Sequence, residues 1–376
     1  MTQKSLRLQI VLVGRVNAGK SSVLNLLTGQ DVSITSAVPG TTTDTVEKNQ
    51  ELHGIGPVTW IDTAGIGDET VLGKERLLKT QKALQKADVA LVVCDGPEVP
   101  VDLIQDLKIP QIRIHTKADL HAHSDREFWI NALDFSARDA VLTRLKQELS
   151  SVVSMPRLSL LDGLVKPNDH LVMITPIDAE APQGRMIVPQ VQTLRAALDA
   201  HAIVTFVQPE EYPSLIQKQK PDLVICDSQV SRLMVEKTPE SIPCTTFSIL
   251  FARMKGDISL LIKGAQRIRT LQDGDKVLIA EACTHHAIED DIARVKIPNL
   301  FLKRGIHPDF HWVSGNDFPD DVSAYQLIVH CGACMFNRAQ MMNRIERAVN
   351  AGTAITNYGL CIAELQGFLD RVTRLF

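Results

Sequence analysis

The stretch LQIVLVGRVNAGKSSVLNLLTG (residues 8–29) decides the fold class of the first part of the chain. Residues 8–13 are typical of a buried strand, and residues 21–29 are typical of a helix. Between them, Gly14–Ser21 matches the phosphate-loop pattern G-x-x-x-x-G-K-S/T in its strand–loop–helix context. We expect the loop N–H groups to cradle phosphates, with Lys20 on the β- and γ-phosphates and Ser21 on Mg²⁺. This stretch predicts nucleotide binding without choosing between ATP and GTP.

Two motifs downstream predict the rest of the magnesium site. DTAG (Asp62–Gly65) follows the strand-like run VTWI and supplies a carboxylate near the metal and a glycine N–H for the γ-phosphate. PGTTTD (residues 39–44) occupies the first switch position, where we expect Thr42 to close over the ion. The predicted Mg²⁺ ligands are therefore Ser21, Thr42 and Asp62.

A third motif selects the base. TKAD (residues 116–119) follows the strand-like run QIRIH, and FSA (residues 135–137) follows the next predicted strand. Asp119 is placed to accept two hydrogen bonds from the guanine edge, which adenine cannot donate, so GTP is predicted. The predicted nucleotide contacts are Gly14, Asn17, Ala18, Gly19, Lys20, Ser21, Ser22, Thr42, Asp62, Gly65, Thr116, Lys117, Asp119, Ser136 and Ala137.

Roughly the first 150 residues resemble the GTPase domains of the tRNA-modification (TrmE) and Era-like branch, on the strength of GRVNAGKSS and PGTTTD. The resemblance implies that Asn17 helps to hold a K⁺ ion that takes the place of an arginine finger, so that K⁺ stimulates GTP hydrolysis. The residues expected to act in catalysis are Lys20, Asn17, Thr42 and Gly65.

Two departures from this family pattern predict a weak and slow GTPase. Thr116 stands where the family usually has asparagine, which removes an amide that braces the base loop. Ile66 follows DTAG, so the glutamine that orients water in Ras-type proteins is missing. Asp68, Glu69 and Glu75 are candidates to position water, although a solvated switch face is the favoured interpretation of all three.

The bulk composition is that of a soluble globular protein. The 376 residues are 44% hydrophobic and 22% charged, and the net charge of −4 gives no case for a nucleic-acid or membrane surface. The apolar run before the phosphate loop is too short for a secretory or membrane-spanning segment, so a cytoplasmic protein is expected. Seven cysteines, spread thinly, do not form a disulfide framework pattern.

Strand-like runs alternate with helical patterns along the whole chain, which predicts mainly parallel sheets covered by helices. The predicted fold is α/β, with a P-loop GTPase domain (residues 1–155) followed by two smaller α/β domains (residues 160–254 and 255–376). The middle domain has no glycine-rich phosphate loop and is expected to bind something else, such as a second copy of itself.

A second chemical signal lies in the last domain. Cys283, His285, His330, Cys331 and Cys334 form the pattern C-x-H…H-C-x-x-C. Each half of this pattern lies at the carboxyl end of a predicted parallel strand, KVLIAEAC or YQLIVHC. At the carboxyl edge of a parallel sheet, residues distant in sequence can converge on one ligand.

Three interpretations of this pattern compete. A structural zinc ion would take a closed Cys₃His set, an iron–sulfur cluster would take three thiolates and one weaker ligand, and buried cysteines would take no metal. Candidates for the fourth iron ligand are Glu281, His285 and His330, and a histidine could instead orient a thiolate or sulfide. Asn337 and Arg338 could bond cyanide or sulfide ligands or simply start a helix. Cys94, Cys226, Cys244 and Cys361 are interpreted as packing residues.

Taken whole, the chain resembles the HydF family of [FeFe]-hydrogenase maturation GTPases, carried by EACTHH, HCGACMFNR, PIDAEAPQGRMIVPQVQTLR and SILFARMKGD. The resemblance implies a homodimer through the middle domain and a [4Fe–4S] cluster on Cys283, Cys331 and Cys334. Whether the dimer goes on to a tetramer stays open. It also implies a scaffold that receives a diiron precursor from radical-SAM maturases and passes it to apo-[FeFe]-hydrogenase.

Two alternatives stay open. One is a tRNA-modification or ribosome-assembly GTPase with a zinc-stabilised tail, although the chain has no basic stripe for RNA. The other is an iron–sulfur GTPase whose cluster is only regulatory. The first alternative predicts RNA binding, and delivery of a diiron unit to the apo-hydrogenase separates the scaffold from the second.

Overall fold

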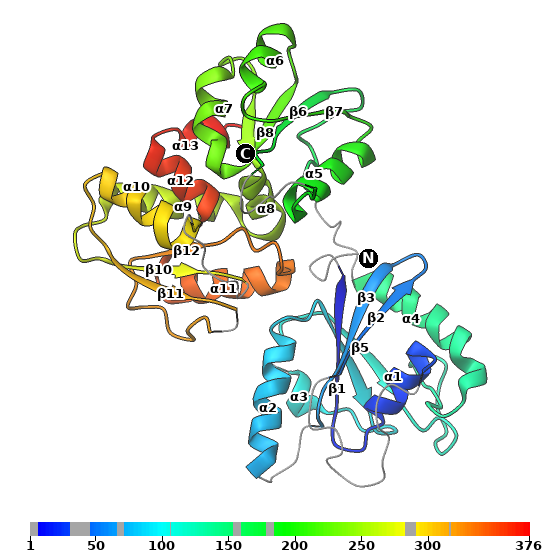
Figure 1. The fold of residues 1–376 in the computed structure, drawn as a ribbon. Coiled ribbons are helices and arrows are strands. Elements are labelled where there is room, and N and C mark those ends of the chain that lie inside the picture. The colour runs from blue at the N-terminus through cyan, green and yellow to red at the C-terminus, as the bar shows by residue number, and fades with distance from the viewer. Residues whose placement is uncertain are drawn as a thin grey trace. The chain divides into compact units, whose positions relative to one another are not determined.

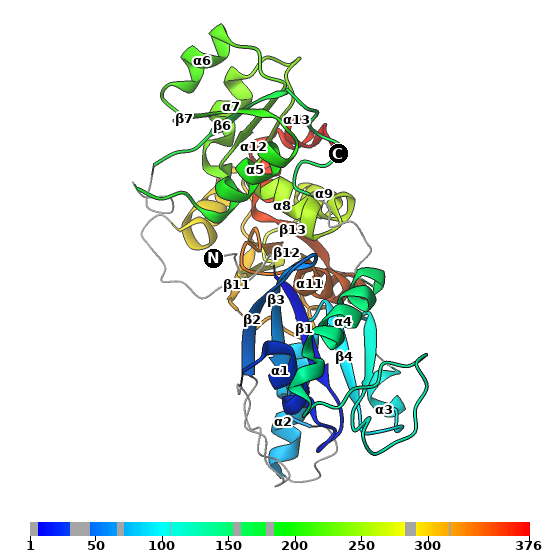
Figure 2. The same ribbon diagram turned by 90° about the vertical axis from the view of Figure 1, so that its right-hand side faces the viewer.

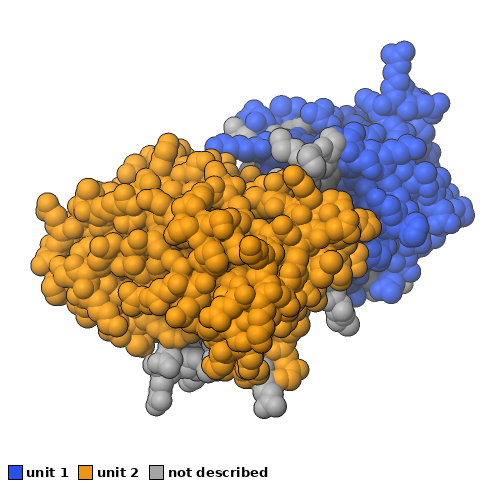
Figure 3. All heavy atoms as spheres, turned by 90° about the horizontal axis from the view of Figure 1, so that it is seen from above, with its two compact units in different colours: residues 1–157 blue, residues 158–376 orange. Residues whose placement is uncertain are grey.

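The structure is a computed structural model that describes residues 7–30, 46–65, 71–105, 107–152, 159–177, 184–282, 291–315 and 317–376. The chain divides into two compact units, Met1–Arg157 and Leu158–Phe376, which carry different colours in Figure 3. Each unit is described by itself.

The first unit is a five-stranded sheet in the order β2-β3-β1-β4-β5, in which only β2 runs antiparallel to its neighbour. Its elements are β1 (Leu8–Val13), α1 (Lys20–Thr28), β2 (Val46–Leu52), β3 (Gly56–Asp62), α2 (Val71–Leu84), β4 (Val89–Cys94), α3 (Val101–Ile104), β5 (Gln111–His115), η2 (Phe135–Ala137) and α4 (Arg138–Val152).

The central strand β1 is buried on both faces, which is why its sequence is apolar almost throughout. Ile10 and Leu12 share a core cluster with residues of α1 and α4, while Val11 and Val13 share another with Ala83 of α2. Figures 1 and 2 show α1 and α4 on one face of the sheet and α2 on the other. Burying alternate residues under opposite helix layers fixes the register of the strand, and with it the loop that follows.

One predicted strand is wrong. The sequence between Asp119 and FSA predicts a strand, but residues 116–134 form turns and loops, and Trp129 makes only an isolated bridge to His115. The apolar residues Phe128 and Ile130 pack into the core from this loop, so burial without regular pairing produced the strand-like pattern.

The second unit contains two four-stranded parallel sheets, in the orders β7-β6-β8-β9 and β11-β10-β12-β13. The first sheet and its helices comprise β6 (His170–Ile174), α5 (Val188–Asp199), β7 (Ile203–Val207), α6 (Tyr212–Lys218), β8 (Leu223–Cys226), η3 (Ser228–Val230), α7 (Ser231–Lys237), β9 (Cys244–Thr246) and α8 (Phe247–Lys255). The second comprises α9 (Ile258–Gln266), η4 (Arg267–Thr270), β10 (Lys276–Ala280), η5 (Ile292–Lys296), α10 (Ile297–Lys303), β11 (Asp309–Val313), β12 (Leu327–His330), α11 (Arg338–Asn350), β13 (Ala354–Asn357), α12 (Tyr358–Gln366) and α13 (Leu369–Thr373).

One hydrophobic core joins these two sheets. It runs from Val172 and Val224 in the first sheet, through Ile249 of α8, to Leu278 and Ile328 in the second sheet. Figure 1 shows α8, α9 and α12 between the sheets. The predicted α/β class with mainly parallel sheets is therefore confirmed, and the second and third modules share one interior.

None of the helices within the described ranges combines the length and hydropathy that crossing a bilayer requires.

Candidate functional site

The phosphate loop has the backbone that its sequence predicts. Asn17 and Gly19 adopt left-handed φ values of 66° and 89°, which turn the chain between β1 and α1. The ammonium of Lys20 lies folded back on the loop and donates to the carbonyl oxygens of Gly14 (3.2 Å) and Arg15 (2.8 Å). Burial lowers the pKa of Lys20 to about 8, while the carboxylate of Asp62 acts against that shift.

The two predicted magnesium ligands in the described residues lie together. Ser21 Oγ donates a hydrogen bond of 2.8 Å to Asp62 Oδ2, so the first turn of α1 meets the end of β3. Gly65 packs so tightly on Val16 that a Cβ atom would lie 2.6 Å from the Val16 Cα, which explains the glycine of the DTAG motif. Thr42, Ile66, Asp68 and Glu69 lie outside the described residues, and nothing is described of the Glu75 side chain.

The predicted base loop is braced against the phosphate loop. The hydroxyl of Thr116 lies 3.0 Å from the carbonyl oxygens of both Ala18 and Cys94. Lys117 has a left-handed φ of 59° and forms an ion pair with Asp95, while Asp119 stands exposed.

The FSA segment is also held by a local contact, because Ser136 donates through its backbone N–H (3.0 Å) and its hydroxyl (2.6 Å) to the Asp134 carboxylate. Ala137 follows in the same turn, η2. The remaining predicted contacts, Gly14, Ala18, Gly19 and Ser22, lie in the phosphate loop or the first turn of α1.

Sequence patterns did not reveal how the base loop is supported. The indole ring of Trp129 stacks on His115 and His123, with ring centroids 4.8 and 5.2 Å apart and planes tilted by 22° in both pairs. Arg138 donates to the carbonyl oxygens of Leu26 and Leu27 at the end of α1, each at 3.1 Å. The Arg138 contacts join segments more than 110 residues apart, and the Trp129 stacking forms within an irregular loop, so only the isolated Trp and Arg could have been noticed.

The cysteine motif lies at the carboxyl edge of the second unit's second sheet. Strands β10 and β12 are parallel neighbours in which Ala280 pairs with His330, and the Cys331 N–H donates to Ala280 O (2.8 Å). The Ala282 N–H in turn lies 3.0 Å from Cys331 Sγ. The convergence of the two predicted strand ends is thus confirmed.

The ligand set itself remains a prediction. Cys331 and Cys334 are half-buried cysteines, and Cys283 and His285 lie outside the described residues. Among the residues that the structure describes, no group of three or more His, Cys, Asp or Glu side chains is close enough to hold a metal ion.

Two candidates for the fourth ligand already have protein partners. His330 is fully buried; its Nδ1 lies 2.8 Å from Cys331 O, and its Nε2 lies 2.7 Å from the Arg344 guanidinium. These contacts assign the imidazole proton to Nδ1, and burial together with Arg344 lowers its pKa to about 3. The buried Glu281 carboxylate pairs with Arg294 at 3.0 Å.

Asn337 and Arg338 have structural roles at the start of α11. Asn337 caps the helix by accepting from Gln340 N at 3.0 Å, with Gln340 reaching back in a capping box. Arg338 donates to the carbonyl oxygens of Met254 (3.0 Å) and Gly256 (2.9 Å). Of the two predicted alternatives for this pair, the structure shows the helix-start role.

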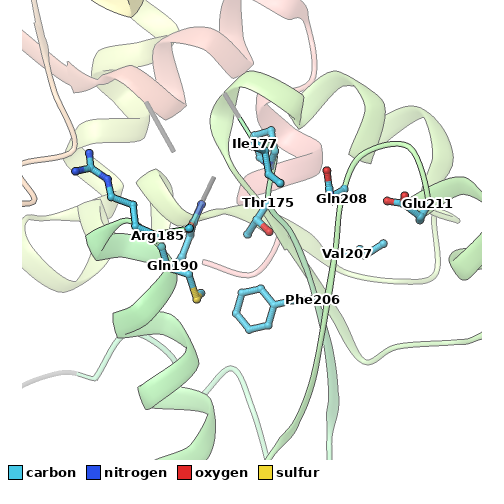
Figure 4. A pocket seen from close by; sticks show the side chains of 11 residues that line it. Thr175, Ile177, Arg185, Gln190, Phe206, Val207, Gln208 and Glu211 are labelled. Carbon is cyan, nitrogen blue, oxygen red and sulfur yellow. The ribbon is translucent and has the colours of Figure 1, made fainter. Parts of the chain in front are cut away.

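A separate pocket opens beside the other sheet of the second unit. It has a volume of about 590 Å³ and lies at the carboxyl ends of β6 and β7, beyond Thr175 and Val207. Figure 4 shows Phe206, Gln190 and Glu211 around it. The remaining lining residues are Pro176, Ile177, Gly184, Arg185, Met186 and Gln208.

Together, the phosphate loop, the Ser21–Asp62 pair and the base loop define the first unit as a P-loop GTPase domain. Residues 9–123 match the model of the 50S ribosome-binding GTPase domain. Residues 160–256 match the hydrogen maturase F dimerization domain, and residues 259–375 match the hydrogen maturase F tetramerization domain. The chain belongs to the hydrogen maturase F (HydF) family of hydrogenase maturation GTPases, and the predicted resemblance is confirmed.

The curated MnmE relatives match about a third of the chain. The tRNA modification GTPase MnmE of Neisseria meningitidis (serogroup A, serotype 4A) is 40% identical over 132 residues, which cover 33% of this chain and 29% of that protein. MnmE of Methylorubrum populi is 35% identical over 149 residues, covering 38% and 33%. The chain thus spans about a third of these relatives, in agreement with the predicted GTPase branch.

Two solved structures are similar at lower levels. NFeoB from S. thermophilus, bound to GDP·AlF₄⁻ and K⁺, has a TM-score of 0.30 and 22% identity over 36% of this chain and 60% of that one. Era in complex with MgGDPNP and a 16S ribosomal RNA segment has a TM-score of 0.29 and 16% identity, covering 82% and 92%.

Proposed function

We propose that this hydrogenase maturation GTPase is a scaffold that binds a [4Fe–4S] cluster and a diiron precursor and delivers the precursor to apo-[FeFe]-hydrogenase. The cluster would be held by Cys283, Cys331 and Cys334. The partners would be radical-SAM maturases as donors, the apo-hydrogenase as acceptor, and a second copy of the chain as the dimer partner.

The observation that carries this proposal is the contact between Ala282 N–H and Cys331 Sγ, at 3.0 Å. Because Ala282 immediately precedes Cys283, this contact brings the backbone of one half of the motif against the thiol of the other half. N–H groups donated to cysteine sulfur are among the contacts that surround protein-bound iron–sulfur clusters.

The described part of the donor set favours an iron–sulfur cluster over a zinc site closed by His330. His330, one of the two histidines of the motif that could complete a Cys₃His set, has both ring nitrogens engaged by Cys331 O and Arg344. Three thiolates would leave one iron with an exchangeable ligand, and that position is where a second iron unit can be held and released. We assign His330 the role of orienting the cysteine loop. The fourth ligand would come from His285, from solvent, or from Glu281 after its carboxylate leaves Arg294.

In the GTPase domain, Lys20 would leave its loop carbonyls for the β- and γ-phosphates, and Ser21 and Asp62 would separate to admit Mg²⁺, with Thr42 closing over the ion. Asn17 would hold K⁺. Since Ile66 stands in place of a water-orienting glutamine, turnover would be slow. The nucleotide state would then bias the contacts of maturases or hydrogenase with the cysteine-bearing module. Equal partner affinity with GTP and GDP would contradict that coupling.

Metal analysis and EPR on protein reconstituted without oxygen test the cluster. We expect about four irons per chain and a reduced-cluster signal, both lost when Cys283, Cys331 and Cys334 are all changed to serine. A Cys226→Ala variant is the matched control, because Cys226 lies in the core of the first sheet. Stoichiometric zinc without iron would refute the proposal.

A second experiment distinguishes a carrier of the diiron precursor from a GTPase whose cluster is only regulatory. The loaded protein is mixed with apo-hydrogenase, and hydrogen evolution is measured. A carrier activates the hydrogenase in proportion to its loading, whereas a regulatory cluster leaves it inactive.

A further inference from the structure

The loop that bears the two described motif cysteines rests on a buried cation. Lys255, the last residue of α8, has only 2% of its surface exposed. Its ammonium donates to the carbonyl oxygens of Ala333 (2.6 Å), Cys334 (3.3 Å) and Phe336 (2.7 Å). A lysine ammonium has three donors, and here all three are used on one turn of four residues.

These three bonds set the orientation of the turn. Ala333 has a left-handed φ of 50°, and its carbonyl oxygen also accepts from Phe336 N–H at 3.0 Å. In a trans peptide the N–H points opposite to the carbonyl oxygen before it. With the Ala333 and Cys334 carbonyls drawn to Lys255, the N–H groups of Cys334 and Met335 therefore point away from the ammonium. Successive N–H groups directed to one side form a concave site for negative charge.

The cation is anchored firmly on its own side. Helix α8 begins at the Thr246 cap, directly after β9, and the Lys255 ammonium lies 5.0 Å from the centre of the Phe251 ring. In the opposite direction Arg338, next to the cysteine turn, donates to the carbonyl oxygens of Met254 and Gly256. The end of α8 and the segment around the cysteine turn are therefore joined by two cations, Lys255 and Arg338, each of which donates to carbonyl oxygens of the other segment.

Burying an ammonium is costly unless polar groups replace its water. The carbonyl oxygens of Ala333, Cys334 and Phe336 replace that water for Lys255, so the buried ammonium is held by the turn that carries Cys334. We propose that Lys255 is a positioning residue of the cysteine site, whose ammonium holds the Ala333–Phe336 turn so that Cys331 and Cys334 face one bound cluster. This inference rests on the cluster binding proposed above. It also makes α8, in the segment matching the dimerization model, the support of a site in the segment matching the tetramerization model.

The test compares Lys255→Met with Lys263→Met in the full chain. Lys263 is exposed on the next helix, α9, so its variant controls for loss of a lysine as such. In iron-free protein, amide hydrogen exchange of residues 331–337 should accelerate about tenfold or more in Lys255→Met, while β12 and the GTPase domain keep wild-type protection. After reconstitution, iron should be lost to a chelator about 10- to 100-fold faster than from wild type or the control.

Unchanged exchange at residues 331–337, or unchanged iron retention, would overturn the inference. Loss of amide protection throughout the second unit in Lys255→Met would indicate a general packing role. The inference would then be overturned if Lys255→Gln, which keeps a neutral hydrogen-bond donor, also unfolds the second unit. If Lys255→Gln folds, amide exchange of residues 331–337 and iron retention in that variant decide. A wild-type protein that takes up no iron would refute the proposed function itself, whereas iron binding with equal retention in the variant refutes only the role of Lys255.

Discussion

The hydroxyl of Thr116 lies 3.0 Å from the carbonyl oxygen of Ala18, and this contact joins the base loop to the phosphate loop. The replacement of the family's asparagine predicted a loss of bracing at this point. The structure shows that the threonine retains part of it, because its single hydroxyl hydrogen is shared between Ala18 O and Cys94 O. An asparagine amide would offer two hydrogens for such contacts.

Thr116→Val should therefore weaken GTP and GDP binding by about fivefold, or about 1 kcal/mol, since it removes the hydroxyl at almost constant volume. Binding is measured by calorimetry with both nucleotides. Thr143→Val, which removes an exposed hydroxyl bonded within α4, is the matched control and should leave affinity unchanged. Equal affinities for wild type and Thr116→Val would show that the contact does not support the nucleotide site.

A glycine substitution isolates the predicted role of Asn17 in K⁺ binding. Asn17 has a φ of 66°, so alanine would add backbone strain, whereas glycine accepts this conformation and removes only the amide. We expect Asn17→Gly to lose the K⁺ stimulation of GTP hydrolysis while keeping the rate measured in Na⁺. Steady-state hydrolysis in KCl and NaCl at equal ionic strength checks this. Stimulation that survives in the variant would remove Asn17 from the ion site.

The buried cysteines should resist alkylation in the native, iron-free chain. Burial raises the pKa of Cys94 and of Cys244 to about 11, so at pH 8 these groups are thiols, and Cys226 and Cys361 are shifted in the same direction. Because the folded pKa values are raised, the associated stability is complete below about pH 8.5, the value for an unfolded cysteine, and is lost as the pH rises through about 11.

Peptide mass spectrometry after iodoacetamide treatment at pH 8 measures this difference. Label is expected on the half-buried Cys331 and Cys334, and on the four buried cysteines only after unfolding in urea. Rapid labelling of Cys226 without denaturant would contradict the packing role predicted for it.

Local patterns were enough to predict most of the framework. Residues 8–13 and 276–280 form buried parallel strands because runs of apolar residues bounded by turn signals have few other solutions. The strand ends then determined which motif halves would meet. The pattern failed at Phe128 and Ile130, where a loop buries two apolar residues without pairing.

Contacts made by long polar side chains could not be predicted in the same way. Lys255 reaches carbonyl groups 78 to 81 residues away, and nothing in the helical period of α8 distinguishes it from an exposed lysine. Arg344 likewise contacts His330 across 14 residues, because α11 and β12 contribute residues to one hydrophobic core. Such contacts depend on how elements pack, and an isolated sequence window carries no record of that packing.

Arg344 should be a major contributor to the stability of the second unit. Its guanidinium lies 4.6 Å from the centre of the Phe318 ring and 4.5 Å from that of Phe336, and it donates to His330 at 2.7 Å. Arg344→Met leaves the buried imidazole nitrogen without its donor, which should cost about 2–4 kcal/mol in the free energy of unfolding.

Urea unfolding of the full chain, followed by a probe in the second unit, measures this cost. Arg347→Met is the matched control on the same helix, since Arg347 pairs at 2.7 Å with the exposed Asp320 and should contribute less than about 1 kcal/mol. Equal destabilisation by the two variants would mean that the aromatic and histidine contacts add nothing.

Strand β7 is the surface on which we expect a second copy of the chain to dock. The opposite edge strand, β9, is fully buried, whereas β7 exposes Ile203 (58%) and Phe206 (37%). Phe206 also lines the pocket in Figure 4. An apolar edge strand presents unpaired backbone groups as well as side chains, so it is a natural pairing surface in a segment that matches a dimerization domain.

Ile203→Lys places a charge in that interface and should weaken the dimer about tenfold or more. Analytical ultracentrifugation over a range of concentrations would detect the shift, with Leu133→Lys as the control because Leu133 is 78% exposed in the GTPase domain. A dimer of unchanged strength in Ile203→Lys would move the interface away from β7.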